Sequence, residues 1–120
     1  MRLSKKRLSI AIKKEILASF YQLIADIKNY REAEIVCDSL LSKAETIAIA
    51  KRLDILWALS HGKKYSEIRE RLNISPATIS KLQLDLKKSG AQKILEKLAA
   101  EKWAAAKEEK IKNFFDRLLK

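Results

Sequence analysis

Apolar residues recur along most of this chain every three or four positions, the spacing that places side chains on one face of an α-helix. The clearest stripe predicts a helix over about residues 9–28 and consists of Ile12, Ile16, Phe20, Leu23 and Ile27. The same periodicity predicts helices over about 29–40, 42–60, 66–72 and 76–88, and a last helix after Gly90. We therefore expect an all-α fold of six helices.

Residues that favour helix ends separate these segments. Asn29 and Ser42 are each followed three positions later by a glutamate, which is the spacing of a capping box at a helix start. Gly62 can adopt the left-handed conformation that ends a helix, and Gly90 is expected to end the helix over 76–88 in the same way. The 120 residues include only 2 glycines and 1 proline, which leaves little material for β-hairpins.

The predicted helix over 42–60 is apolar on almost every side. At about 100° per residue, its apolar residues point nearly all the way round: Ile47, Ile49, Ala50, Leu53, Ile55, Leu56, Trp57 and Leu59. A helix of this kind has to be buried on all sides, and six short helices of one chain can scarcely surround it. The pattern therefore favours a homodimer over a compact monomer.

The stretch from Tyr65 to Leu86 has the pattern of a helix, a tight turn and a second helix. Ser75 is a good N-cap, because its hydroxyl can accept hydrogen bonds from the first turn of the second helix. Pro76 follows at a position where its missing N–H costs nothing. We expect six apolar residues to form a small core here: Ile68, Leu72, Ile74, Ile79, Leu82 and Leu86. The pattern predicts a helix-turn-helix over about 66–88.

The exposed first turns of the second helix carry small, hydroxylated or basic residues, the surface that a helix needs in order to enter the DNA major groove. By position, our candidates for contacts with base edges are Ala77, Thr78 and Lys81. Candidates for phosphate contacts surround this helix or lie in the N-terminal arm: Lys5, Lys6, Arg7, Lys63, Lys64, Arg69 and Ser80.

The net charge of +11 is unevenly distributed along the chain. Residues 1–14 carry six basic and no acidic residues, and residues 62–89 carry seven basic and three acidic residues. Positive charge gathered beside a helix-turn-helix is expected of a polyanion-binding protein, whereas a merely solvated surface does not need this sorting. We expect a flexible basic arm over 1–8 and a single helical DNA-binding and dimerisation domain over 9–120.

The run GKKYSEIRERLNISPATISKL, with the preceding segment SKAETIAIAKRLDILWALSHG, resembles the bacterial Trp repressor superfamily. It is most similar to small Trp-repressor-like proteins with a motif of roughly G-K-x-Y-x-E-I, a turn, and S-x-A-T-I-[ST]-[RK]. The resemblance covers roughly residues 18–90 and implies a six-helix helix-turn-helix fold that forms an intertwined homodimer. It also implies a transcriptional regulator, with repression as the expected effect. Because the sequence shows neither a bilayer-spanning apolar run nor a secretory signal pattern, we expect a cytoplasmic protein.

The resemblance does not extend to tryptophan sensing. The family's tryptophan slot lies between the third and fifth helices and needs an arginine on each, with a glycine directly after the second arginine. Arg52 can supply the first arginine, but Lys81 replaces the second and Leu82 occupies the glycine position. Because a leucine side chain projects into the space of the indole ring and overpacking is costly, no tryptophan corepressor is expected. No other cofactor is predicted, and the sequence does not identify another effector.

The remaining chemistry-bearing residues indicate neither an enzyme nor a metal site. Cys37 is the only cysteine and His61 the only histidine, so a transition-metal site lacks a ligand set. We expect His61 to cap the end of the helix over 42–60. No paired-acid, catalytic-triad or glycine-rich phosphate-loop pattern is present, and no apolar run is long enough to span a bilayer.

These observations predict a sequence-specific, double-stranded DNA-binding regulator, and they leave two alternatives open. One is a nonspecific nucleic-acid-binding or chromosome-associated protein that uses the same basic surface. The other is a helical protein-interaction module with a vestigial helix-turn-helix. Thr78→Ala distinguishes the first alternative, because it relaxes sequence preference only in a specific reader. Retention on duplex DNA at moderate salt distinguishes the second.

Overall fold

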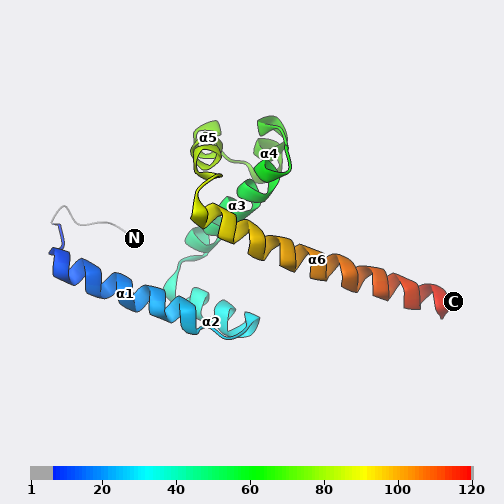
Figure 1. Cartoon of the computed structure of the whole chain (residues 1–120), viewed down its shortest axis with the longest axis horizontal. Coiled ribbons are helices and arrows are strands. Elements are labelled where there is room, and N and C mark those ends of the chain that lie inside the picture. The colour runs from blue at the N-terminus through cyan, green and yellow to red at the C-terminus, as the bar shows by residue number, and fades with distance from the viewer. Residues whose placement is uncertain (1–6, 120) are drawn as a thin grey trace. The chain divides into compact units, whose positions relative to one another are not determined.

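A computed structural model of the protein describes residues 7–119. Within these residues it contains six helices and no strand (Figure 1). The helices are α1 (Ile10–Asp26), α2 (Tyr30–Leu40), α3 (Lys43–Ser60), α4 (Tyr65–Leu72), α5 (Pro76–Asp85) and α6 (Ser89–Leu118). The predicted all-α fold and the order of its helices are confirmed. None of the described helices is both long and apolar enough to cross a membrane.

The chain divides into two compact units, Met1–Lys43 and Ala44–Lys120. The first unit contains α1 and α2, and none of the residues described in these two helices is buried. The predicted apolar stripe of α1 is between 39% and 50% exposed at Ile12, Ile16, Phe20 and Leu23. Two helices are too few to bury this stripe, so the first unit has an apolar surface that its own helices leave open.

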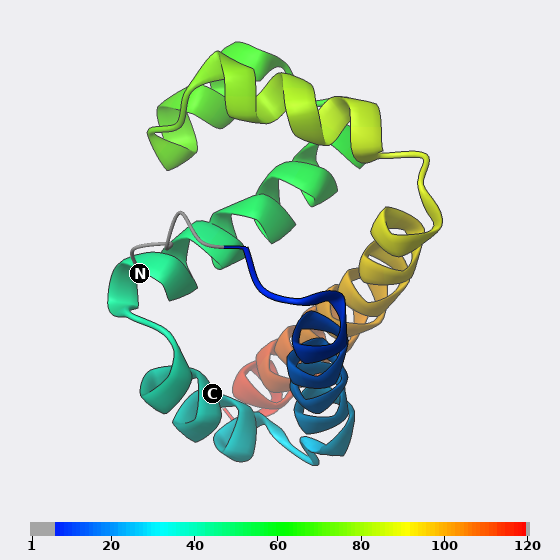
Figure 2. The same ribbon diagram turned by 90° about the vertical axis from the view of Figure 1, so that its left-hand side faces the viewer.

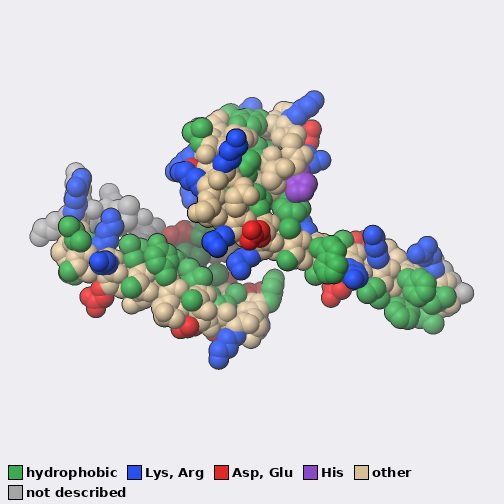
Figure 3. Space-filling view, viewed as in Figure 1, with side chains coloured by type: hydrophobic (Ala, Val, Ile, Leu, Met, Phe, Trp, Pro, Cys, Tyr) green, Lys and Arg blue, Asp and Glu red, His purple; other side chains and the backbone are tan. Residues whose placement is uncertain are grey.

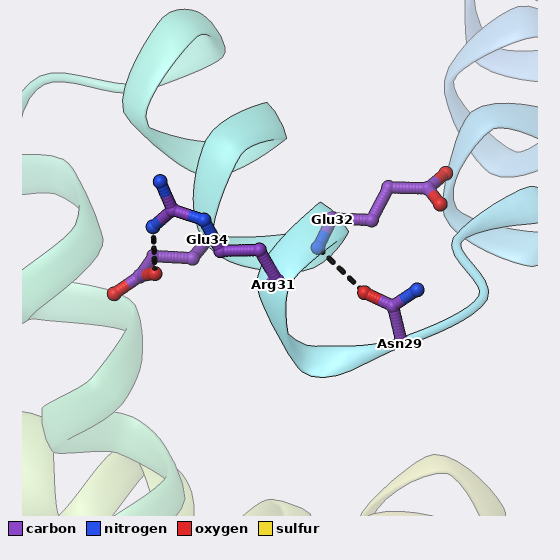
Figure 4. A network of polar contacts seen from close by, with 4 residues as sticks. All are labelled: Asn29, Arg31, Glu32 and Glu34. Atoms are coloured by element: carbon purple, nitrogen blue, oxygen red, sulfur yellow. Dashed lines mark hydrogen bonds and ion pairs between the residues drawn. The ribbon is translucent and has the colours of Figure 1, made fainter.

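Side chains cap both helices of the first unit. The Ser9 hydroxyl accepts a hydrogen bond from the first turn of α1 at 3.2 Å. At the start of α2, Asn29 Oδ1 accepts a hydrogen bond from the backbone N–H of Glu32 at 2.8 Å (Figure 4). In the same turn, Arg31 Nη1 lies 2.6 Å from Glu34 Oε1. The hydrogen bond from Glu32 to Asn29 confirms Asn29 as the N-cap of α2.

The core of the second unit joins α3, α4 and α5. Its buried members are Ile55 and Leu59 from α3, Ile68 from α4 and Ile79 from α5, with exposed fractions of 0% to 8%. Five partly buried residues pack against them: Ala58, Leu72, Ile74, Leu82 and Leu86. This confirms the predicted core of the helix-turn-helix and adds α3 as a further wall. Figures 1 and 2 show α4 and α5 next to each other on the same side of α3.

Two residues with positive φ shape the turns on either side of α4. Gly62 has a φ of +71°, and its N–H donates to the carbonyl of Leu59 at 3.1 Å. This confirms Gly62 as the residue that ends α3. Asn73 has a φ of 52° at the C-cap of α4. Because asparagine tolerates the left-handed conformation better than most residues, Asn73 can turn the chain from α4 into α5.

The structure differs from the sequence prediction at the end of α5. The helix ends at Asp85 rather than near residue 88, and Gly90 lies in the first turn of α6 instead of ending α5. Lys88 has an extended conformation, with φ −68° and ψ 151°, and is the N-cap of α6. The side-chain amide of Gln92 donates to the carbonyl of Leu86 at 2.8 Å. This bond satisfies an acceptor that the end of α5 leaves open, so no glycine is needed there.

The apolar side chains of α6 change sides along its unbroken length of 30 residues. In its first part Ala91 is buried, and Ile94, Leu95 and Leu98 are partly buried. In its last part five large apolar residues are between 51% and 63% exposed: Trp103, Ile111, Phe114, Phe115 and Leu118. At about 100° per residue, the centres of these two faces lie about 170° apart. The C-terminal half of α6 therefore presents a largely uncovered apolar face.

Candidate nucleic-acid interface

The start of α5 is held by its N-cap and by the core. The Ser75 hydroxyl accepts a hydrogen bond from the backbone N–H of Thr78 at 3.4 Å, and Pro76 follows the cap as the first residue of the helix. Three positions after Pro76, Ile79 is completely buried. The cap and the buried side chain together determine which residues of α5 face the solvent.

Four exposed side chains line the solvent face of α5. Ala77, Ser80 and Lys81 are exposed, and their spacing places them on one side of the helix. Leu84 lies on the same side, four residues after Ser80, and is 81% exposed. Leu84 was not among the residues selected from the sequence. Its spacing of three residues from Lys81 and seven from Ala77 is the signal that identifies it.

Thr78 does not share this face. It is partly buried, and at about 100° per residue it lies about 110° from the centre of the exposed face. Its hydroxyl is 3.0 Å from the hydroxyl of Ser75, so its side-chain oxygen is engaged in the cap. The structure thus brings Ala77 and Lys81 together as candidate base-contacting residues and places Thr78 to one side of them.

The phosphate-contact candidates of the helix-turn-helix are all exposed. Lys63 and Lys64 precede α4, Arg69 lies within α4, and Ser80 lies within α5. Lysine and arginine side chains stand out over α4 and α5 in Figure 3. Lys63, Lys64 and Arg69 form no ion pair with another described residue. Their charges are therefore available to an external polyanion.

Two other cations of this region are paired with acidic side chains. Arg71 Nε lies 3.1 Å from Asp54 Oδ2 and links α4 to α3. Lys88 Nζ lies 2.8 Å from Asp85 Oδ1. The hydrogen bond from Lys88 lowers the pKa of Asp85 and outweighs an opposing desolvation effect, and the positive charges of Lys88 and Lys81 act in the same direction. These pairs therefore reduce the free positive charge of this surface.

The three remaining phosphate-contact candidates belong to the N-terminal arm. Lys5 and Lys6 lie outside the residues that the structure describes. Arg7 is exposed and belongs to the first unit, Met1–Lys43. The structure therefore groups the candidates on α4, on α5 and in the turn before α4, and it leaves the arm as an independent expectation.

A cavity of about 550 Å³ lies between α3, α5 and the start of α6. Its volume falls within the usual range of small-molecule sites. Arg52 and Leu82 both line it, whereas Lys81 is exposed outside it. Leu82 also packs against the core that contains Ile55 and Ile79. At the position of the family's glycine, the leucine side chain forms one wall of the cavity but does not close it.

His61 contacts the last turn of α3. Its Nδ1 lies 2.9 Å from the carbonyl oxygen of Trp57, and the centroids of the His61 and Trp57 rings are 4.2 Å apart. This contact agrees with the predicted capping position at the end of α3. Cys37 is a partly buried free cysteine. Among the residues that the structure describes, no group of three His, Cys, Asp or Glu side chains is arranged to hold a metal ion.

Comparison with protein-family models identifies a family for this chain. Residues 15–102 match the family model described as Trp repressor protein. The match begins within α1 and ends within α6, so it includes the complete helix-turn-helix. Neither the curated proteins nor the solved structures contain a match to this chain. Because the family match covers well over half of the chain, the protein belongs to the Trp repressor family, a family of helix-turn-helix DNA-binding regulators.

Proposed function

We propose that this protein is a sequence-specific, double-stranded DNA-binding transcriptional regulator that acts as a homodimer. The observation that supports this most directly is the exposed face of α5, which carries Ala77, Ser80 and Lys81 on a helix anchored by buried Ile79. The small side chains allow the helix to approach the floor of the major groove, and the hydroxyl and amine can bond to base edges or phosphates. α5 is the proposed recognition helix.

The residues of α5 have different proposed roles. Lys81 is a donor to guanine O6 or N7, which are common partners of lysine in the major groove. Ala77 makes an apolar contact with a base edge. Thr78 contacts a base either through its methyl group or after its hydroxyl leaves Ser75. The proposed phosphate contacts, which orient the protein without reading sequence, are Lys5, Lys6, Arg7, Lys63, Lys64, Arg69 and Ser80.

A homodimer is proposed because large apolar surfaces remain exposed in both units. They are the stripe on α1, the first half of α3, where Ile47 and Ile49 are 49% and 48% exposed, and the C-terminal half of α6. A second copy can cover such surfaces, and burial of apolar area drives association. Two-fold symmetry then places two copies of α5 in successive major grooves, roughly 34 Å or 10 base pairs apart. The expected site is therefore a near-palindrome.

In this arrangement residues 9–120 act as a single DNA-binding and dimerisation domain, and residues 1–8 form a basic arm that adds phosphate contacts. Repression is the proposed effect, because a dimer bound at a promoter excludes other proteins from the same DNA. The proposed compartment is the cytoplasm, where bacterial DNA is located. No enzymatic step is part of this function.

No tryptophan corepressor is part of this function either. The family's tryptophan slot uses an arginine and a glycine at positions that are Lys81 and Leu82 in this chain. The cavity beside Arg52 retains room for a small molecule, but its wall at Leu82 has a shape different from the one that glycine provides. Tryptophan titration, described below, tests this part of the proposal.

Selection of bound sites from random duplexes tests the proposed function. We expect a near-palindromic consensus that binds at least about a thousandfold more tightly than a scrambled duplex, as is typical of specific DNA-binding proteins. Equal affinity for all duplexes would indicate a nonspecific nucleic-acid-binding protein. Failure to retain the protein on any duplex at moderate salt would indicate a protein-interaction module.

A further inference from the structure

Leu84 is the side chain of α5 that the fold itself does not explain. It is 81% exposed, whereas the next most exposed large hydrophobic residue of α3 to α5 is Ile47 at 49%. The nearby leucines, Leu82 and Leu86, both pack against the core. Leu84 therefore contributes almost no buried apolar area to its own unit, and an exposed leucine has no advantage over a polar residue at this position.

Leu84 lies within the face that the proposed function directs toward DNA. Ser80 is four residues before it and Lys81 is three residues before it, so both are its neighbours on the helix surface. Ala77 lies two turns earlier on the same side. From residue 77 to residue 84 the helix rises by about 10 Å, which corresponds to about three base pairs. When α5 lies along the major groove, Leu84 therefore meets a base pair different from the one that Ala77 meets.

An aliphatic side chain in the major groove has one specific kind of partner. The C5-methyl group of thymine is the apolar group that a base pair presents there, and the other edge groups are hydrogen-bond donors or acceptors. A leucine that covers a polar edge desolvates it without replacing its hydrogen bond, which is costly. A leucine that covers a methyl group buries apolar area on both sides. This difference discriminates between bases without any hydrogen bond.

We propose that Leu84 is a specificity-determining residue that packs against the C5-methyl group of one pyrimidine in each half-site. The inference rests on the proposed function and adds the chemical group that α5 reads in its third turn. Lys81 and the neighbouring cations hold the helix near the DNA by charge. Leu84 adds preference for a methylated pyrimidine at one position.

The test uses the full-length protein and the duplex obtained by site selection. Each thymine of a half-site is replaced in turn by deoxyuridine, in both half-sites together, which removes only the methyl group. At one position we expect wild-type affinity to fall about fourfold for each half-site, the value for one buried methyl-sized group, or about 15-fold in total. Leu84→Ala should bind the thymine and deoxyuridine duplexes equally well.

Duplexes with cytosine or 5-methylcytosine at the same position show whether the protein recognises the methyl group of thymine alone or that of any C5-methylated pyrimidine. An advantage of 5-methylcytosine over cytosine that Leu84→Ala abolishes supports recognition of any C5-methylated pyrimidine. A Leu84-dependent effect seen with thymine but not with 5-methylcytosine supports recognition of thymine alone.

Two matched variants control the measurement. Leu119 is 84% exposed but lies outside α5, so Leu119→Ala should leave both affinity and the methyl effect unchanged. Lys81→Ala should weaken binding and keep the methyl effect at the Leu84-dependent position. Leu84→Ala should retain its melting temperature, because alanine is a good helix former and the side chain that it replaces is exposed.

The outcomes separate this inference from the proposed function. If no position shows a methyl effect, or if the effect persists in Leu84→Ala, the inference is overturned while the function stands. If Leu84→Ala weakens specific and scrambled duplexes equally, or turns a dimer into a monomer, Leu84 makes another contact and the inference is again wrong. If the wild type prefers no site at all, the proposed function itself has failed.

Discussion

The proposed site depends on which face of α5 is turned to the core, and two apolar residues of this helix test that orientation. Ile79 is completely buried between α3, α4 and α5, whereas Leu84 is 81% exposed. Replacement of either by alanine removes three carbon atoms, so the two variants differ in environment and not in the size of the deletion. We predict that only Ile79→Ala strongly destabilises the protein.

The expected magnitude follows from the burial of each side chain. At about 0.8 kcal/mol for each methylene-sized group, Ile79→Ala loses about 2.4 kcal/mol of burial free energy. The remaining cavity adds to this loss, so the free energy of unfolding should fall by about 3–4 kcal/mol, within the range of about 2–5 kcal/mol for isoleucine-to-alanine changes in cores. Because Leu84 buries almost nothing, Leu84→Ala should change this free energy by less than about 0.5 kcal/mol.

Urea denaturation followed by far-ultraviolet circular dichroism measures both changes. The variants must be compared at one protomer concentration, because the stability of a dimer depends on concentration. A similar loss in both variants, or a larger loss in Leu84→Ala, would show that α5 turns a different face to the core. The assignment of Ala77, Ser80 and Lys81 to the DNA-facing side would then be wrong.

Four further predictions concern assembly, DNA contacts, ligand and pH. Sedimentation equilibrium at micromolar concentration should give twice the chain mass of 13.8 kDa, and a well-folded monomer would contradict the dimer. Deletion of residues 1–8 should weaken specific and nonspecific DNA binding by similar factors, and it should reduce the slope of log affinity against log salt concentration by about 0.9 for each lost phosphate contact. Lys81→Ala should instead reduce the binding free energy by roughly 1–3 kcal/mol, mainly on the preferred site. The reverse pattern across a salt series would exchange the two roles. Saturating tryptophan should leave DNA affinity unchanged, and a tenfold tightening, about 1.4 kcal/mol of coupling, would show that the cavity beside Leu82 accepts the indole. The hydrogen bond from Lys88 lowers the pKa of Asp85 in the folded protein, so the ionised Asp85 stabilises the fold above the ordinary aspartate pKa near 3.9 and loses this effect as the pH falls below it. The stability difference between wild type and Asp85→Asn, measured by urea denaturation from pH 7 to pH 2.5, should therefore vanish at the acidic end. A difference that stays constant with pH would contradict the assigned ion pair.

The sequence by itself determined the helices, most of their ends and the core of the helix-turn-helix. Asn29 and Ser75 cap the helices predicted to start beside them, and Gly62 ends α3 with positive φ. These features were predictable because each depends on residues no more than about four positions apart. The packing of Ile68 against Ile79 was also predictable, since a short turn joins the two helices that carry them.

Only the tertiary structure decided where α5 ends and α6 begins, and which side chains of α5 are exposed. Gly90 has the conformational freedom to end one helix or to begin the next, and in the fold it lies in the first turn of α6, where the side chain of Gln92 bonds to the carbonyl of Leu86. Spacing placed Thr78 near the candidate base contacts, but in the fold its hydroxyl lies 3.0 Å from the Ser75 hydroxyl, whereas Leu84 is exposed. Periodicity shows which residues share a face of a helix. Which face of α5 is covered depends on contacts with α3 and α4, and those contacts exist only in the folded chain.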